Sequence, residues 1–292
     1  MSTSTDGGLT WGTPQTTGNR ATGLGGQPVI QPNGAVIVPA ATADENGIIA
    51  FSSTDGGASW SSTVTVSSAK THTVAAGPRT GPMPSAEIDG AGKVYVGWQD
   101  CRFRKRCASN DIVYSTSTNG TTWSTVTRIP IDSASSGVDH FIPGLAVDKN
   151  TSGATASIAA SYYYYPVADC TAATCQLDVG LIKSTDAGTS WTAATQVAGP
   201  MTIAWLPNTS QGPMVGDYVS TSFSSGTARP AFEVAAANSG TVFNQATYVP
   251  TVGLLKGLST TAATVATTDA DRAPVPNAAS DRADSISVLT VR

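Results

Sequence analysis

One eight-residue repeat constrains the fold of this chain more than any other feature. Residues 4–11 read STDGGLTW, residues 53–60 read STDGGASW, and residues 184–191 read STDAGTSW. A fourth copy, residues 116–123, reads TSTNGTTW, with Thr118 in the place of the acid. Four of the six tryptophans end these copies, and the intervals between the copies vary in length. The pattern indicates a structural repeat with variable loops, and we call each copy a box.

The residue types in a box are those of a self-contained hairpin turn. Short oxygen-bearing side chains accept hydrogen bonds from the backbone of their own turn, and glycine tolerates a positive φ angle. The tryptophan that follows can bury a large ring against a sheet. An unrelated all-β solenoid with similar turns would also account for the repeat. The residues that we assign to this structural role are Asp6, Trp11, Asp55, Trp60, Trp123, Asp186 and Trp191.

The boxes resemble the Asp-box (BNR) repeat of sialidases and related β-propellers, where the box joins the third and fourth strands of a blade. Residues 93–100, 139–143 and 216–218 also look like recurrent segments of bacterial secreted sialidase-like BNR proteins. The resemblance covers residues 1–250. It implies an all-β propeller of four-stranded antiparallel blades with Asp-box hairpins. Strands assigned outward from each box predict about five blades, or six if the tail contributes one.

The sequence divides at about residue 250. Apolar runs broken by Gly, Asn and Asp continue to that point, whereas residues 251–292 are rich in Ala, Thr, Asp and Pro. We therefore expect a propeller domain over residues 1–250 and a linker-like tail over residues 251–292, with a final strand at 285–291. The last sheet before the tail lacks an outer strand, for which residues 12–17 are our candidate. Because the first box begins at Ser4, we expect a trimmed or natural fragment that starts within a blade and lacks its signal peptide.

Composition and cysteine spacing favour an exported protein. The net charge of −4 and the lack of a Lys/Arg-rich tail argue against nucleic-acid binding, and no apolar run approaches the roughly 18 residues of a membrane span. The cysteines form two local pairs, Cys101 with Cys107 and Cys170 with Cys175, and neither pair has a histidine nearby. We predict a disulfide within each pair and an extracellular location, with free buried thiols as the alternative. No metal site and no cofactor are predicted.

Candidate site residues gather in the loops that precede each first strand or join second to third strands. On the propeller interpretation, these loops lie opposite the boxes, where ligands of propellers gather around the central channel. The sialidase resemblance implies a glycan or glycoconjugate as the partner. The catalytic candidates are Asp100, Asp139 and Tyr218, and the ligand-binding candidates are Arg79, Arg102, His140, Tyr164, Tyr165 and Asp217.

Structural alternatives exist for several of these residues. The basic stretch 102–106 can be a solvated loop tip, His140 can cap a loop, and Asp217 can hold a turn. Classical sialidases use three arginines, an Asp acid/base and a Tyr nucleophile. Arg128 lies in an Arg-Ile-Pro sequence like that of the first sialidase arginine, but it follows the third box and is not assigned that role. Two functions therefore remain: an extracellular glycoside hydrolase of exo-sialidase type acting on acidic, sialic-acid-type sugars, and a non-catalytic propeller that binds glycan or protein.

Overall fold

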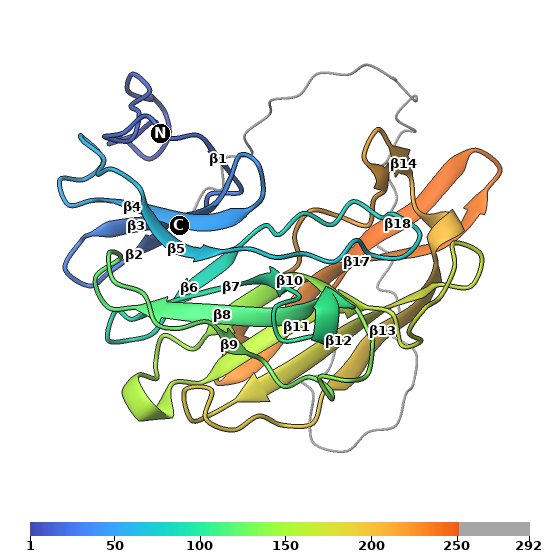
Figure 1. The fold of residues 1–292 in the computed structure, drawn as a ribbon. Coiled ribbons are helices and arrows are strands. Elements are labelled where there is room, and N and C mark those ends of the chain that lie inside the picture. The colour runs from blue at the N-terminus through green and yellow to red at the C-terminus, as the bar shows by residue number, and fades with distance from the viewer. Residues whose placement is uncertain (251–292) are drawn as a thin grey trace.

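The computed structural model describes residues 1–250, which form antiparallel sheets that pack against one another (Figure 1). The predicted all-β fold built from four-stranded antiparallel units is confirmed. The predicted number of blades stays a prediction, and the predicted strand at residues 285–291 lies outside the described residues. Within residues 1–250, no helix has the length and apolar character that a membrane crossing requires.

Three sheets run in chain order from an inner to an outer strand. Sheet 1 consists of β2 (Val29–Ile30), β3 (Val36–Thr42), β4 (Gly47–Ser53) and β5 (Val64–Ser68), and the short β1 (Gly23–Leu24) also pairs with β3. Sheet 2 consists of β6 (Ser85–Ile88), β7 (Val94–Asp100), β8 (Asp111–Ser117) and β9 (Thr127–Arg128). Sheet 3 consists of β10 (His140–Val147), β11 (Ile158–Tyr164), β12 (Gln176–Ser184) and β13 (Thr195–Thr202).

The fourth sheet has three strands among the described residues. They are β16 (Ser220–Ser224), β17 (Thr227–Ser239) and β18 (Val242–Tyr248). A two-stranded hairpin, β14 (Asn208–Thr209) with β15 (Gly212–Pro213), precedes this sheet. Residues 1–250 also contain three short 3-10 helices, η1 (Lys105–Cys107), η2 (Gly153–Thr155) and η3 (Ile203–Trp205).

Alternating residues of one strand build the cores on both faces of a sheet. In β7, Val96 and Trp98 pack in the core shared with sheet 1, whereas Tyr95 between them packs in the core shared with sheet 3. Successive side chains of a strand point to opposite faces, so a strand that is apolar at nearly every position must be covered on both sides. Each large apolar side chain buried in this way stabilises the fold by about 1.5–3 kcal/mol. Continuous apolar strands therefore force the sheets to stack face to face.

The inner strands β6, β10 and β16 lie side by side. The Leu145 amide of β10 donates a hydrogen bond to Ser85 Oγ of β6 at 2.9 Å, and Thr221 Oγ1 of β16 donates to the Gly144 carbonyl at 2.9 Å. A Cβ atom at Gly144 would lie 2.4 Å from the Val219 carbonyl oxygen, so only glycine allows this close approach. Together with the cores between the sheets, these contacts fix the order of sheets 2, 3 and 4.

The boxes that follow β4, β8 and β12 close their hairpins as the residue types predict. In the box after β4, Ser53 Oγ accepts from the Gly57 amide at 2.8 Å and Asp55 Oδ1 accepts from the Ser59 amide at 3.0 Å. Hydrogen bonds, first of all from the Ser59 hydroxyl, hold the pKa of Asp55 well below its usual range. Gly57 has a φ of +88°. The turn is therefore held by its own side chains.

The box at residues 116–123, the third along the chain, differs from the predicted alignment. Asn119, not Thr118, takes the place of the acid: its Oδ1 accepts from the Thr122 amide at 2.9 Å. Ser117 Oγ accepts from the Gly120 amide three residues later, whereas the serine and glycine amide are four residues apart in the box after β4. The turn is thus one residue shorter, which shifts the equivalent positions.

The first box lies outside the sheets, which corrects two expectations. Residues 12–17 form no strand and do not complete the fourth sheet. Instead, Gly18 donates to the Ser61 carbonyl at 3.0 Å, so the N-terminal segment lies against the box of sheet 1. Trp11 is 52% exposed, whereas Trp60 is 9% exposed. Within residues 1–250, no sheet lies beneath the first box, and its tryptophan stays largely exposed.

The two ends of the molecule differ. Gln31 Nε2 donates to the Gly92 carbonyl at 2.6 Å, and the Gly90 amide donates to the Thr151 carbonyl at 2.9 Å, so the first turns of sheets 1, 2 and 3 lie together. Gln31 also donates to the Thr118 carbonyl of the third box at 2.9 Å. We call this the box end. The loops that join second to third strands lie at the opposite end, as predicted.

Candidate functional site

A long segment crosses the end opposite the boxes. Residues 69–84 lead from β5 to β6, and Figure 1 shows this segment running from β5 toward β18 and back. We call it the strap, and the end that it covers the strap end. The strap is hydrogen-bonded at sheets 1, 2 and 3 and at the β14–β15 hairpin. The Ala69 amide donates to the Asn46 carbonyl next to sheet 1 (2.9 Å), and the Cys101 amide next to sheet 2 donates to the Lys70 carbonyl (2.7 Å). Tyr165 Oη, next to sheet 3, donates to the Ala75 carbonyl (3.1 Å), and the Arg79 amide donates to the Pro213 carbonyl of the hairpin (2.8 Å).

The predicted disulfides Cys101–Cys107 and Cys170–Cys175 are confirmed. Their Cα atoms lie 4.7 Å and 4.9 Å apart. Both bridges lie in the loops that join the second and third strands of their sheets, at the strap end. Each bridge therefore limits the conformations of a loop that carries candidate site residues.

Asp100 and Arg102 form a partly buried ion pair at the start of the loop after β7. Asp100 is fully buried, and Arg102 Nη2 lies 2.6 Å from its Oδ2. Trp98 Nε1 also donates to Asp100 Oδ2 at 3.2 Å, and Arg102 Nη1 donates to Ser67 Oγ of β5 at 3.0 Å. The pair joins sheet 2 to sheet 1; Asp100 is closed off from solvent, whereas the Arg102 side chain is 23% exposed.

The rest of the basic stretch 102–106 is divided between surface and interior. Lys105 and Arg106 are exposed, as expected for a solvated loop tip, but Arg104 is 5% exposed. Its Nη1 donates to the Ser133 carbonyl at 2.6 Å and to Ser136 Oγ at 3.0 Å. The interpretation of this stretch as a solvated loop tip is thus wrong for Arg104, which is buried and holds the loop after β9 through these hydrogen bonds.

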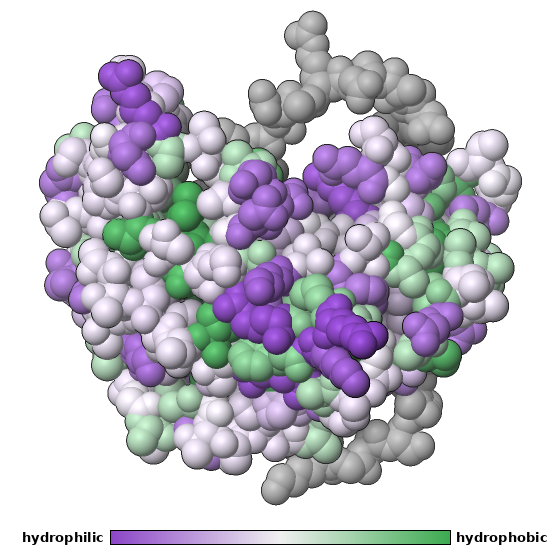
Figure 2. Space-filling view, viewed as in Figure 1, coloured by the Kyte–Doolittle hydropathy of each residue, from purple (hydrophilic) through white to green (hydrophobic). Residues whose placement is uncertain are grey.

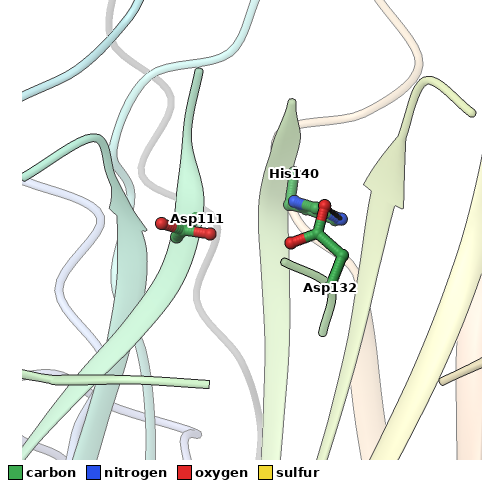
Figure 3. Close-up of side chains that lie close together, drawn as sticks. All are labelled: Asp111, Asp132 and His140. Carbon is green, nitrogen blue, oxygen red and sulfur yellow. Dashed lines mark ion pairs between the residues drawn. The ribbon is translucent and has the colours of Figure 1, made fainter. Parts of the chain in front are cut away.

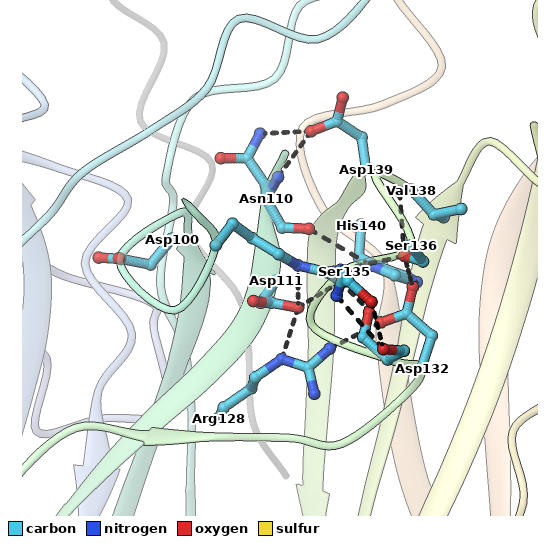
Figure 4. A network of polar contacts seen from close by, with 12 residues as sticks. Asp100, Asn110, Asp111, Arg128, Asp132, Ser135, Ser136, Val138, Asp139 and His140 are labelled. Atoms are coloured by element: carbon cyan, nitrogen blue, oxygen red, sulfur yellow. Dashed lines mark hydrogen bonds and ion pairs between the residues drawn. The ribbon is translucent and has the colours of Figure 1, made fainter. Parts of the chain in front are cut away.

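Arg104 belongs to an ion network between sheets 2 and 3. Figure 4 labels its other members, Asp111, Arg128 and Asp132, and Figure 3 shows the two aspartates beside His140. Arg104 Nη2 lies 2.6 Å from both Asp111 Oδ1 and Asp132 Oδ1. Arg128 Nε lies 2.8 Å from Asp111 Oδ1, and Arg128 Nη2 lies 2.6 Å from Asp132 Oδ1. Two cations thus neutralise two carboxylates. Burial nevertheless raises the pKa of Asp111, against the influence of Arg104 and Arg128.

His140 borders this network as a neutral imidazole. Burial lowers its pKa to about 4, although Asp132 opposes the shift. His140 Nδ1 lies 3.3 Å from the Asn110 carbonyl oxygen, which can only accept, so Nδ1 carries the proton. Nε2 then presents a lone pair, 3.8 Å from Asp132 Oδ2.

Asp111, Asp132 and His140 present ligand atoms within 4.8 Å of one another. This spacing resembles that of a metal site, but Arg104 and Arg128 already contact both carboxylates. A divalent cation would add two positive charges to a buried network that is neutral without it. The donor set therefore does not fit a metal ion.

Another buried carboxylate, Asp139, contacts His72, the other histidine of the chain. Asp139 Oδ1 accepts from the Asn110 amide at 2.7 Å, and His72 Nδ1 lies 3.2 Å from both Asp139 oxygens. Burial raises the pKa of Asp139, while Asn110 and His72 oppose the shift. His72 side-chain exposure is 35%. Sequence reasoning missed His72, although it is one of only two histidines in the chain. A carboxylate that orients an accessible imidazole allows proton exchange at its other nitrogen.

Arg79, Asp217 and Tyr218 form a group at the strap end that is open to solvent. Arg79 Nε lies 2.7 Å from Asp217 Oδ1, and Arg79 Nη2 donates to Asp217 Oδ2 at 2.9 Å. Tyr218 is 47% exposed. Partial burial, together with the nearby Asp217 carboxylate, raises the pKa of Tyr218. A Cβ atom on Gly25 would lie 2.9 Å from Tyr218 Oη, which puts the phenol beside the chain before β2. Of all the predicted site residues, these three form the most open cluster.

The tyrosine run at the end of β11 keeps one ring accessible. Tyr163 and Tyr165 are buried, and Tyr165 packs edge-on against Phe141 with ring centroids 5.4 Å apart. Tyr165 therefore offers no face for stacking, contrary to the expectation. Tyr164 is half-buried and stacks on His140 at 6.0 Å with an interplanar angle of 21°. The alternation of the strand and the coverage by the strap together explain this difference.

No protein-family model and no curated protein sequence matches the chain. Several solved structures do match. An alpha-L-arabinanase from Penicillium chrysogenum, complexed with arabinobiose, has a TM-score of 0.51 and 14% identity over 78% of this chain and 64% of its own. An alpha-L-arabinofuranosidase from Fusarium graminearum has a TM-score of 0.50 and 17% identity over the same shares of the two chains. The NanB sialidase from Streptococcus pneumoniae has a TM-score of 0.46 and 16% identity over 79% of this chain and 32% of its own.

The match to the two fungal enzymes is a match of fold. This chain spans less than two thirds of the length of either enzyme. Together with the sheet order, the likeness establishes that the chain has a β-propeller fold.

Proposed function

We propose that this protein is an extracellular glycan-binding propeller of the Asp-box (BNR) type, with its ligand at Arg79, Asp217 and Tyr218. The observation that carries the proposal is the combination of an ion pair and a half-exposed aromatic ring in one solvent-open cluster. Sugars offer hydroxyl groups for charged hydrogen-bonding partners and an apolar ring face for an aromatic side chain. The two disulfides support an extracellular location.

The fold neighbours support a glycan as the class of ligand. The Penicillium enzyme is described as an arabinanase complexed with arabinobiose, and the Fusarium enzyme as an arabinofuranosidase. Arabinobiose is therefore a first test ligand. We further propose that residues 1–250 form the binding domain and that residues 251–292 are a tail outside it.

The geometry favours neutral sugars over the acidic sugars that the sialidase resemblance implies. Two nitrogens of Arg79 already face Asp217, so the pair has no net charge. The remaining guanidinium donors can bind hydroxyl groups, whereas a sugar carboxylate would meet the negative charge of Asp217. An acidic sugar would have to displace Asp217 before it could pair with Arg79.

Binding is also better supported than hydrolysis. Glycoside hydrolysis generally requires two acidic groups on either side of one glycosidic bond. The catalytic candidates Asp100, Asp139 and Tyr218 belong to three separate sets of contacts, with Arg102, with His72 and Asn110, and with Arg79 and Asp217. The exo-sialidase alternative needs these groups at one bond.

Calorimetric titration of the full chain with arabinobiose and with sialyllactose tests the proposal. We expect binding of the neutral sugar and loss of most of its affinity in Tyr218→Ala and Asp217→Ala. Trp11→Ala is the matched control because it removes an aromatic ring of similar exposure at the first box. Binding of sialyllactose alone, or equal affinity in Tyr218→Ala and the wild type, would contradict the proposal. Release of a fluorogenic group from an arabinoside or sialoside would show that the protein hydrolyses its ligand.

A further inference from the structure

An open cavity lies between sheets 2 and 3, apart from the Arg79 cluster. Its volume is about 260 Å³, and it is bordered by residues 131–138 on one side and residues 194–196 on the other. His140, Tyr162 and Tyr164 line it between these segments. Ligand pockets for drug-sized molecules range from roughly 300 to 1,000 Å³, so this one suits a smaller molecule, of the size of one sugar ring.

The wall formed by residues 131–138 is held rigidly from behind. Arg104, which is buried, donates to the Ser133 carbonyl and to Ser136 Oγ, and its ion pair fixes Asp132. Ser136 Oγ also donates to Asp132 Oδ2. The positions of Asp132 and Ser136 are therefore set before any ligand arrives, which reduces the entropy cost of binding.

Two hydrogen-bond acceptors face each other in this cavity without a donor between them. His140 Nε2 presents a lone pair because Nδ1 donates to the Asn110 carbonyl, and Asp132 Oδ2 lies 3.8 Å from it. Among the described residues, His140 Nε2 makes no hydrogen bond, and the His140 side chain is only 2% exposed. A hydroxyl group of a ligand can donate to either acceptor, and two neighbouring hydroxyls can satisfy both.

The opposite side of the cavity supplies an aromatic face. Tyr164 is half-buried and held against the His140 ring, so its orientation is defined. Gln196, which is exposed on β13, can both donate to and accept from hydroxyl groups. An aromatic ring, an amide, the free acceptor His140 Nε2 and the carboxylate oxygen Asp132 Oδ2, which can accept a further hydrogen bond beside that from Ser136, match a ring that is apolar on one face and bears hydroxyls at its edge.

We infer that the cavity between sheets 2 and 3 binds a single neutral sugar ring, stacked on Tyr164 with hydroxyl groups donating to His140 Nε2 and Asp132 Oδ2. This site does not depend on the proposed function, because it shares no residue with the Arg79, Asp217 and Tyr218 cluster. Arg104, Arg128 and Asp111 hold its frame and do not contact the sugar.

Saturation-transfer NMR with monosaccharide methyl glycosides tests this site. The probes are the methyl glycosides of glucose, galactose and arabinose, with glycerol as a control that has hydroxyls but no ring. The decisive variant is Ala194→Trp, which places a large ring in the cavity mouth from an exposed position. Its matched control is Ala58→Trp, at a box position where the other copies carry Leu9, Thr121 and Thr189.

We expect transfer to at least one glycoside and none to glycerol. In Ala194→Trp the affinity should fall tenfold or more, whereas Ala58→Trp should retain it. Tyr164→Leu, which keeps an apolar side chain without the ring, should weaken binding in the same way. Absence of transfer to every glycoside, or equal binding by Ala194→Trp and Ala58→Trp, would overturn the inference. Loss in Tyr218→Ala with retention in Ala194→Trp would also overturn it, because all binding would then belong to the Arg79 cluster.

Discussion

Replacement of Arg104 by Met is the perturbation whose effect follows most directly from the structure. Arg104 contacts Asp111 Oδ1 and Asp132 Oδ1 and donates to the Ser133 carbonyl, all from a buried position. Without it, a neutral network carries one uncompensated negative charge. Asp111 Oδ2 has no hydrogen-bond partner among the described residues, so Arg128 then supplies the one ion pair that Asp111 keeps there.

The size of the effect can be worked out from these contacts. Removal of one partner of a buried ion pair costs about 3–5 kcal/mol. Because Arg128 still pairs with both aspartates, we expect a loss of about 4 kcal/mol in the free energy of unfolding. For a chain of this length, that corresponds to a fall in Tm of roughly 8–16 °C. A loss of this size removes a large part of the stability of a typical domain, about 5–15 kcal/mol.

Urea denaturation followed by tryptophan fluorescence measures this loss. Lys105→Met is the matched control, since Lys105 is exposed in the same loop, and its change should stay within about 0.5 kcal/mol. Burial raises the pKa of Asp111 in the folded state, and loss of Arg104 raises it further. A carboxyl group with a raised pKa destabilises the fold above that pKa and ceases to do so as protons bind. The deficit of Arg104→Met should therefore shrink in acid. A deficit below about 1 kcal/mol, or one that grows in acid, would refute our account of this network.

Three further predictions concern single residues. Trp60→Ala should lower the free energy of unfolding by about 3–5 kcal/mol and Trp11→Ala by far less in the same urea titration, because only Trp60 is buried; equal losses would contradict this. The pKa of His140 is lowered to about 4, so stability should fall by about 3 kcal/mol as the pH drops from 6.5 to 4, and His140→Gln should remove that slope in thermal melts at several pH values. Burial raises the pKa of Asp178 to about 6, and its Oδ1 has no hydrogen-bond partner within residues 1–250, so Asp178→Asn should raise Tm above pH 6 and lose this advantage below pH 4; an unchanged Tm at alkaline pH would argue against it.

Local sequence patterns predicted the features of the fold that depend on local chemistry. The box turns are closed by side chains within a few residues, so their letters alone predict the hairpins, as at Ser53 and Asp55. The same holds for the two disulfides, whose cysteines are close in sequence. The letters alone do not identify Asn119 as the residue that takes the place of the acid, because an alignment of letters assumes equal turn lengths.

Features that depend on distant partners could not be predicted in this way. Arg104 has the appearance of a surface residue within RFRKR, and its burial follows from partners about 30 residues later in the chain. Tyr165 looks like a loop residue next to a strand, but the strap covers it through Ala75. Trp11 has the letters of a buried box tryptophan and is exposed, since its turn lies outside the sheets of the described residues. In each case, the environment of the side chain depends on whether a distant part of the chain contacts it.

The strap also has a consequence for the order in which the chain folds. Each sheet packs on its sequence neighbours, so sheets can assemble one after another along the chain, as in other repeat architectures. The strap belongs to the connection between sheets 1 and 2, but it bonds to Tyr165 of the loop after β11 and to Pro213 of the β14–β15 hairpin. It can dock only after those later parts are in place, so we expect its contacts to form late in folding, after the main barrier. Substitutions such as Arg79→Ala are therefore expected to speed unfolding and leave the folding rate almost unchanged, which stopped-flow kinetics can measure.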